Sequence, residues 1–249
     1  MENAFRKFVI QITRRTIHQT KLYIILMFAV TTLVSVVYMW QINGAASSAS
    51  HAATAQLGAL SVLIGPLFIP ILASIIGSLP LVIFLSDKAR GVYEYLMAYE
   101  FDLVQIYLAF IVASMIAVLM FVLPAVVVVL LSAHLMNIAV SSLLVEMILV
   151  YTIPYSVLVT VIVILMSLTW SALAQKRQFV NSPTGIAPLI GSAPTFVLLF
   201  ISIFGSASGD IPVSNIITYS GILSVFIALL LVVMVFVSIK KMARERFLP

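Results

Sequence analysis

The sequence predicts an all-α integral membrane protein with six transmembrane helices, and three observations lead to that class. Hydrophobic residues make up 63% of the 249 residues and charged residues only 8%, with a mean hydropathy of +1.23. A soluble domain keeps a polar exterior and has no use for so much apolar surface. The apolar residues also gather in runs of membrane-spanning length, and the lysines and arginines are distributed between those runs in a one-sided pattern.

Six apolar runs are long enough to be spans, since a helix needs about 20 residues to cross the hydrocarbon core. Several runs are longer than that, so tilting or extension beyond the bilayer is expected. Little of the chain is left for a separate soluble part, and residues 1–249 are expected to form a single transmembrane domain. The predicted spans are residues 22–42, 57–85, 103–133, 143–174, 184–205 and 216–239.

Residues 1–21 have the pattern of an amphipathic helix. Phe5, Phe8, Val9 and Ile12 recur at helical spacing, and the basic residues lie largely on other faces. This pattern favours an interfacial helix on the inner membrane face, where basic side chains meet anionic lipid headgroups; the alternative is a mobile basic leader. The run at 22–42 is expected to be a retained span, because it is longer than a signal h-region, although the small residues at 45–55 resemble a cleavage site.

The basic residues predict the orientation of the chain. All thirteen lysines and arginines fall on the same side of a six-span topology, and the three opposite connections contain none. Because cytoplasmic loops carry the excess of Lys and Arg, both termini are expected in the cytoplasm of a multi-pass protein of the cell membrane. The thirteen residues are Arg6, Lys7, Arg14, Arg15, Lys21, Lys88, Arg90, Lys176, Arg177, Lys240, Lys241, Arg244 and Arg246.

Spans two and five are the two most interrupted by proline and glycine. Breaks in a span are tolerated where neighbouring helices or a water-lined cavity satisfy the freed carbonyls, and interrupted helices often flank a transport path. The alternative is that proline and glycine are simply common in spans, where glycine permits close packing. The candidate residues of a translocation path are Ser61, Pro66, Pro70, Ser74, Ser78, Pro188, Ser192, Pro194 and Thr195.

The chain offers little of its own for catalysis. It has no cysteine and no P-loop, H-E-x-x-H or G-x-S-x-G motif, so neither an enzyme nor a metal site is expected. Its net charge of +5 is read as a membrane orientation signal and not as a nucleic-acid surface. Glu146 is either interfacial or part of a proton path, and His51 and His134 are weak metal candidates.

Residues 86–102, between spans two and three, hold six of the twenty-one charged residues of the chain. Val92, Tyr95, Leu96 and Tyr99 follow the spacing i, i+3, i+4, i+7, which predicts a short helix with one apolar stripe. Gly91 is suited to the break before it. The functional interpretation is a cytoplasmic docking surface, and the alternative is an interfacial turn that only connects two spans.

The residues Asp87-Lys88-Ala89-Arg90-Gly91-Val92-Tyr93-Glu94-Tyr95-Leu96-Met97-Ala98 resemble a segment of ABC-2-type transporter permeases. In that family an acidic–basic pair leads to Gly-x-x-Glu-x-Leu-x-Ala just after the second span. The expected topology, with an amphipathic first helix, six spans and both termini inside, is also similar. The sequence departs from the family pattern after Ala98, where Tyr99 and Glu100 replace the usual proline, and in a short outer connection between spans five and six.

The resemblance implies that the chain is the permease half of an ATP-driven exporter. Two permease subunits, alike or different, would pair, and spans two and five would line the path between them. Each would engage a separate ATPase that carries the P-loop, ATP and Mg²⁺, so this chain would bind no cofactor itself. The segment after span two would be the coupling helix, with a docking surface and its edge formed by Gly91, Glu94, Tyr95, Leu96 and Tyr99 and by Asp87, Lys88 and Arg90.

Two other functions stay open from the sequence. One is an autonomous channel or secondary carrier, which would be expected to place ionisable residues along its path, where few are found. The other is a membrane-embedded assembly subunit without a transport role. For an exporter, the scarcity of charge favours a lipidic or amphiphilic substrate.

Overall fold

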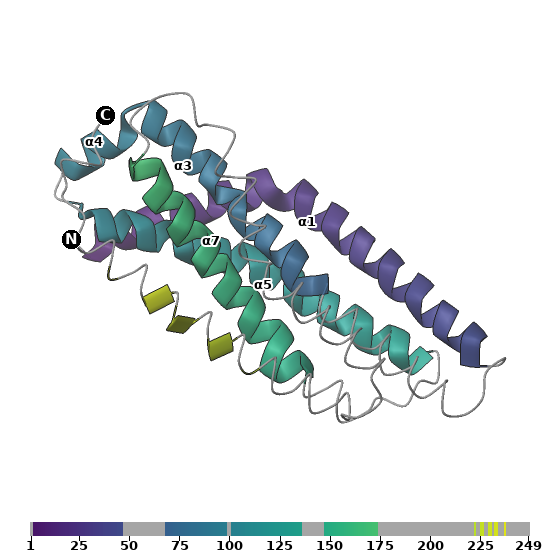
Figure 1. The fold of residues 1–249 in the computed structure, drawn as a ribbon. Helices are drawn as coiled ribbons and strands as arrows, with labels where there is room; N and C mark the ends of the chain where they lie inside the picture. The colour runs from purple at the N-terminus through teal and green to yellow at the C-terminus, as the bar shows by residue number, and fades with distance from the viewer. Residues whose placement is uncertain are drawn as a thin grey trace.

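A computed structural model of the protein describes residues 2–46, 68–98, 101–135 and 147–173, together with eight residues between 222 and 237. The described elements are helical (Figure 1). They are α1 (Glu2–Ala46), α3 (Pro80–Ala89), α4 (Val92–Ala98), α5 (Leu103–Leu135), the π-helix η1 (Met147–Thr152) and α7 (Ile153–Leu173). A helical stretch at 68–78 precedes α3.

Three helical segments of the described part are long and apolar enough to cross a membrane: Ala4–Val37, Phe68–Lys88 and Val104–Ser132. They overlap predicted spans one, two and three and support the predicted class of α-helical membrane protein. η1 and α7 occupy most of predicted span four. The described residues do not include span five, residues 57–67 of span two or most of span six. The total of six spans therefore stays a prediction.

Helix α1 differs from the prediction, because the expected interfacial helix at 1–21 and the span at 22–42 are one uninterrupted helix of 45 residues. At about 1.5 Å per residue it is about 68 Å long, roughly twice the thickness of a hydrocarbon core. No glycine or proline occurs between residues 2 and 43. Nothing in the covalent structure therefore ends the helix at residue 22, and the entry into the membrane at this position stays a prediction.

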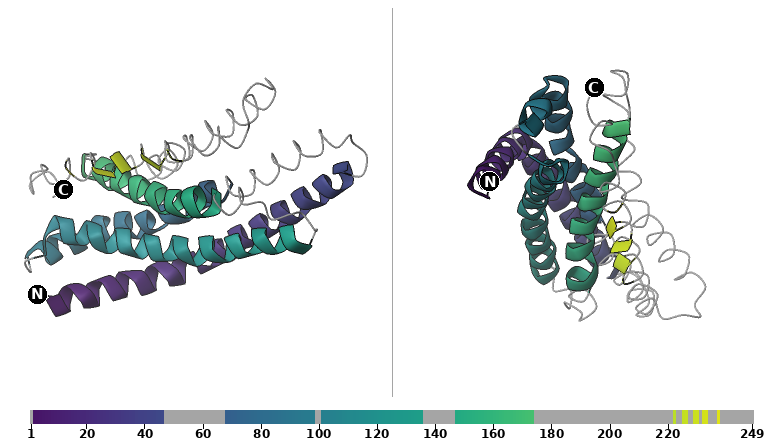
Figure 2. Two further views of the ribbon diagram at one scale, coloured as in Figure 1. Left: turned by 90° about the horizontal axis from the view of Figure 1, so that it is seen from below. Right: turned by 90° about the vertical axis from the view of Figure 1, so that its left-hand side faces the viewer.

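Helix α1 packs mainly along α5, and the two run side by side from the same end of the molecule (Figures 1 and 2). Thr16, Thr20, Thr31 and Ser35 are buried on α1. Small residues of this kind let membrane helices approach closely. The hydroxyls of Thr20 and Thr31 donate to the carbonyls four residues earlier, both at 2.8 Å, so these two hydroxyls are satisfied within the helix.

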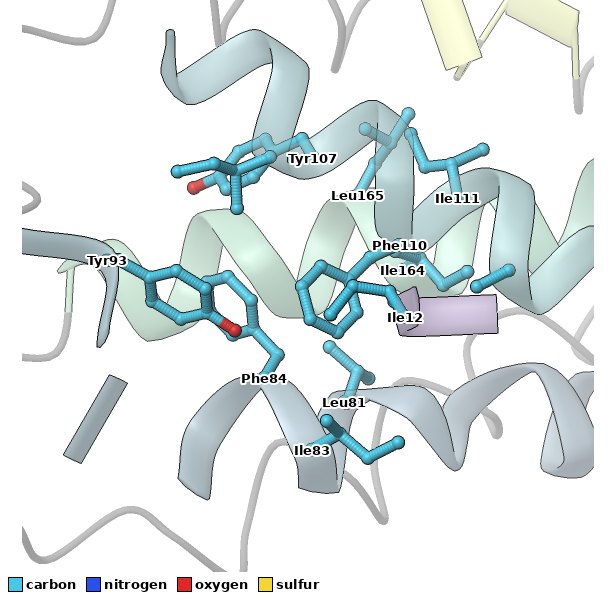
Figure 3. Packing of buried hydrophobic residues seen from close by; sticks show 12 residues of the cluster. Ile12, Leu81, Ile83, Phe84, Tyr93, Tyr107, Phe110, Ile111, Ile164 and Leu165 are labelled. Carbon is cyan, nitrogen blue, oxygen red and sulfur yellow. The ribbon is translucent and has the colours of Figure 1, made fainter. Parts of the chain in front are cut away.

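The N-terminal part of α1, the junction of α3 and α4, and the start of α5 meet at one end of the helix bundle, here called the N-terminal end (Figure 1). Phe8 of α1 contacts Phe101 just before α5, with ring centroids 5.6 Å apart. A buried cluster at this end joins α1, α3, α4, α5 and α7 through residues such as Ile12, Phe84, Tyr93, Phe110 and Ile164 (Figure 3). A second buried cluster, around Ile76 and Phe121, packs the 68–78 helix against α5.

Helix α7 follows directly after the π-helical turn η1 and has a proline at its second position. Pro154 has no backbone N–H to donate to the carbonyl four residues earlier, and η1 immediately precedes α7. Thr152, Ser156 and Thr160 then form a fully buried stripe at i, i+4, i+8. The Ser156 and Thr160 hydroxyls donate to the carbonyls of Thr152 and Ser156, at 2.6 and 2.7 Å. This stripe gives α7 a small-residue face on which another helix can pack closely.

Candidate functional site

The turn between α3 and α4 is built around Gly91. Its φ of 71° lies in the left-handed region, where a residue with a Cβ is disfavoured. The Arg90 and Gly91 amides donate to the carbonyls of Asp87 and Lys88, at 3.2 and 3.0 Å, and so end α3. Tyr95 N–H then donates to the Gly91 carbonyl at 3.3 Å in the first turn of α4. The predicted break at Gly91 and the short helix after it are both confirmed.

Replacing Gly91 by alanine is expected to destabilise the chain by about 1–2 kcal/mol through the left-handed backbone. The new Cβ would lie 3.6 Å from Glu94 Oε2, an ordinary contact, so no steric term is added. Gly91→Asn is the control, because asparagine accepts this conformation more readily. Thermal unfolding of the full chain in detergent measures both, and an equal loss for Ala and Asn would contradict the backbone explanation.

Tyr93 anchors α4 to the bundle. It is 2% exposed, stacks on Phe84 of α3 with ring centroids 4.8 Å apart, and contacts Phe110 of α5 edge-on at 6.3 Å (Figure 3). Leu96 and Met97 are partly buried against the same cluster. The packed stripe of α4 is therefore Tyr93, Leu96 and Met97. Tyr93 and Met97 were missed by the sequence analysis, although the three residues fit the same i, i+3, i+4 spacing as the predicted stripe.

The opposite face of α4 is exposed. Tyr95 is 63% and Val92 37% exposed, and Glu94 is exposed beside them. The predicted stripe is thus divided, with Val92 and Tyr95 facing outward and Leu96 turned partly inward. Arg90 is exposed in the turn, Lys88 is half-buried at the end of α3, and Tyr99 lies outside the described residues. Of the predicted docking residues, Arg90, Glu94 and Tyr95 are each exposed, and Leu96 packs against the buried cluster.

Asp87 is not at an exposed edge. It is 4% exposed and forms an ion pair with Arg15 of α1, whose Nη1 donates to Oδ2 at 2.8 Å and to Oδ1 at 2.9 Å. Burial raises the pKa of the Tyr93 phenol, the Asp87 carboxylate raises it further, and Arg15 acts in the opposite direction. Tyr93 therefore stays a neutral phenol in the cluster. Arg15 was missed as a site residue, because its partner lies 72 positions away in the sequence.

No protein-family model, curated protein or solved structure matches this chain.

The candidate path residues fall into two groups. Pro70, Ser74 and Ser78 lie at i, i+4, i+8 on one helical face and are buried within the chain. The Ser74 and Ser78 hydroxyls donate to the carbonyls of Ile71 and Ile75, each at 2.7 Å, so their protons are committed to the local backbone. The other candidates, which lie outside the described residues, are Ser61, Pro66, Pro188, Ser192, Pro194 and Thr195.

Within the described ranges, no group of three or more His, Cys, Asp or Glu side chains is placed to hold a metal ion.

What the described residues do offer is a surface: a short helix with an exposed aromatic face, fixed at the N-terminal end of the bundle by a buried tyrosine and a buried carboxylate.

Proposed function

We propose that the chain is the membrane-spanning permease subunit of an ATP-driven exporter of the ABC-2 type, and that a separate ATPase docks on α4. The observation that carries this proposal is the exposed face of α4, where Tyr95 stands 63% exposed beside Val92 and Glu94. This face lies at the N-terminal end of the bundle. The one-sided distribution of basic residues predicts that this end is cytoplasmic.

The composition of this face suits a protein partner. Binding energy in protein interfaces concentrates in a few residues, with tyrosine, tryptophan and arginine enriched among them. Tyr95 provides such an anchor, and Arg90 and Glu94 provide charges of both signs around it. An exposed aromatic side chain between charges therefore suits the centre of a docking surface on an otherwise apolar chain.

The attachment of α4 suits the transmission of force. Tyr93 contacts α3 through Phe84 and α5 through Phe110, and close-packed interiors transmit displacement instead of absorbing it. The Arg15–Asp87 ion pair ties the end of α3 to α1. A push on α4 would therefore act on three membrane helices together, as expected of a coupling helix driven by an ATPase.

The rest of the proposal follows the family resemblance. A second permease subunit would complete the path, with spans two and five lining it, and ATP and Mg²⁺ would bind to the partner ATPase. The low charge of the chain favours a lipidic or amphiphilic substrate.

Replacing Tyr95 by aspartate is expected to weaken ATPase binding by roughly 30-fold, the effect of losing a hot-spot residue of about 2 kcal/mol. The measurement is the amount of P-loop ATPase that co-purifies with the tagged full chain from native membranes, and the ATPase activity of that complex. Tyr95→Phe is the matched control and should retain the partner, because it keeps the ring.

Two outcomes would contradict the proposal. Wild-type chain that purifies without any P-loop ATPase, and that transports solute in ATP-free vesicles, would identify an autonomous carrier. An ATPase that binds Tyr95→Asp as well as wild type would remove α4 from the docking surface.

A further inference from the structure

A groove of about 530 Å³ lies on the surface between α1 and α5, on the N-terminal half of α1. Its apolar wall is formed by Val9, Ile10 and Ile17 of α1 and by Ile116 of α5. Ile10 and Ile116 are both exposed. The groove is separate from the exposed face of α4 and from the candidate path residues.

Basic residues border this groove. Arg14, His18 and Lys21 recur at i, i+4, i+7, so they share one face of α1, and all three are exposed. None of the residues lining the groove is acidic. The adjacent Arg15 is engaged with Asp87, whereas Arg14 and Lys21 sit at the groove. The groove thus combines an apolar wall with a row of cations.

The surroundings of the groove extend its apolar character along α1. Beyond Lys21, Leu22, Ile25 and Leu26 are all highly exposed. In a membrane-spanning helix such residues face lipid. Side chains of an α-helix lean toward its N-terminus, so the charged ends of Arg14 and Lys21 are carried toward the N-terminal end of the bundle. Their charge is thus directed toward the water, and the apolar surface of Leu22, Ile25 and Leu26 continues from the groove toward the bilayer centre.

We propose that this groove binds one anionic phospholipid, with its phosphate between Arg14, His18 and Lys21 and an acyl chain against Ile17 and Ile116. Basic pockets between membrane helices bind anionic headgroups in this way. The apolar wall selects a lipid over a free phosphate, because a phosphate alone would leave that wall uncovered. The proposal concerns one bound lipid in a defined groove, and it does not depend on the proposed exporter function.

The test is native mass spectrometry of the purified full chain in an uncharged detergent, titrated with phosphatidylglycerol or with phosphatidylcholine of the same acyl chains. Wild type is expected to bind one phosphatidylglycerol in preference to phosphatidylcholine. The double variant Arg14→Ala/Lys21→Ala should bind phosphatidylglycerol roughly 30-fold more weakly, since each basic side chain near the headgroup contributes several-fold. Ile116→Trp, which fills the groove without changing charge, should also weaken binding.

The matched control is Arg6→Ala/Lys7→Ala, which removes the same charge from exposed positions of α1 outside the groove. It should leave phosphatidylglycerol binding within a few-fold of wild type. An equal loss in both double variants would show diffuse surface attraction and overturn the proposal, as would equal binding of the two lipids. Glycerol 3-phosphate that binds as tightly as phosphatidylglycerol would identify a site for free phosphate and also overturn it. Melting temperatures of all variants distinguish lost binding from lost folding.

Discussion

Replacing Arg15 by alanine is expected to lower the free energy of unfolding by about 2–3 kcal/mol. The substitution leaves the Asp87 carboxylate buried without its cation, and breaking a buried pair in this way costs about 3–5 kcal/mol. The lower value is expected here because the Arg15 side chain is 38% exposed, so water screens part of the interaction, whereas that of Asp87 is 6% exposed. Arg6→Ala, which removes an exposed charge from the same helix, should change stability by less than about 0.5 kcal/mol.

A double-mutant cycle separates the ion pair from general damage. Arg15→Ala alone leaves the Asp87 carboxylate without its cation, and Arg15→Ala/Asp87→Ala removes that carboxylate as well. The double variant should therefore lose about 1–2 kcal/mol less stability than the two single variants lose in sum. Chemical unfolding of the full chain in detergent, followed by tryptophan fluorescence, provides the values. Strictly additive effects would mean that the contact between α1 and the end of α3 contributes no coupling energy.

Replacing Gly77 by alanine is expected to destabilise the protein by about 1–3 kcal/mol, the usual cost of overpacking. A Cβ at Gly77 would lie 2.6 Å from Thr160 Cγ2 and 2.9 Å from Thr160 Oγ1, well inside van der Waals contact. The clash falls on a buried residue of α7 whose hydroxyl is already bonded to Ser156. In an open helix the same change would stabilise by about 1 kcal/mol, so a measured loss has to come from the contact between the two helices.

The rescue variant Gly77→Ala/Thr160→Ala tests that explanation. Removing Cγ2 and Oγ1 of Thr160 leaves its Cβ at 3.1 Å, a distance that a small shift can accommodate. The double variant should therefore regain much of the stability lost by Gly77→Ala, as measured by melting temperature in detergent. If Thr160→Ala gives no rescue, the close approach of the 68–78 helix to α7 is not the cause.

Local features of the sequence predict local structure well in this chain. The spans that include α1, α3 and α5 follow from long apolar runs, and the turn at Gly91 follows from the one residue type that accepts a left-handed φ without strain. The predicted start of span one at residue 22 rested on a change in polarity alone, and the helix continues through this position. A change in polarity determines where a helix lies relative to the membrane. A glycine, a proline or a capping residue is what ends the helix.

The candidate site was harder to predict, because its decisive contacts are long-range. Tyr93 and Tyr95 have the same chemistry and lie two positions apart, and only the packing of Phe84 and Phe110 determines which of them is buried. Asp87 carries no local sign that its partner is Arg15. The role of α4 in docking a partner, the six-span topology and the pairing of subunits stay predictions that the experiments above address.

The uninterrupted course of α1 has a consequence for its rotational phase. Each residue of an α-helix advances by about 100°, so the face of α1 that carries Arg15 and the face that carries Thr31 and Ser35 are locked to one another. Inserting a single residue between positions 21 and 22 would turn one half by about 100° relative to the other. The chain could then keep the ion pair to Asp87 or the small-residue contact with α5, but not both. A rotation of the N-terminal half of α1 would therefore also turn the C-terminal half of the same helix.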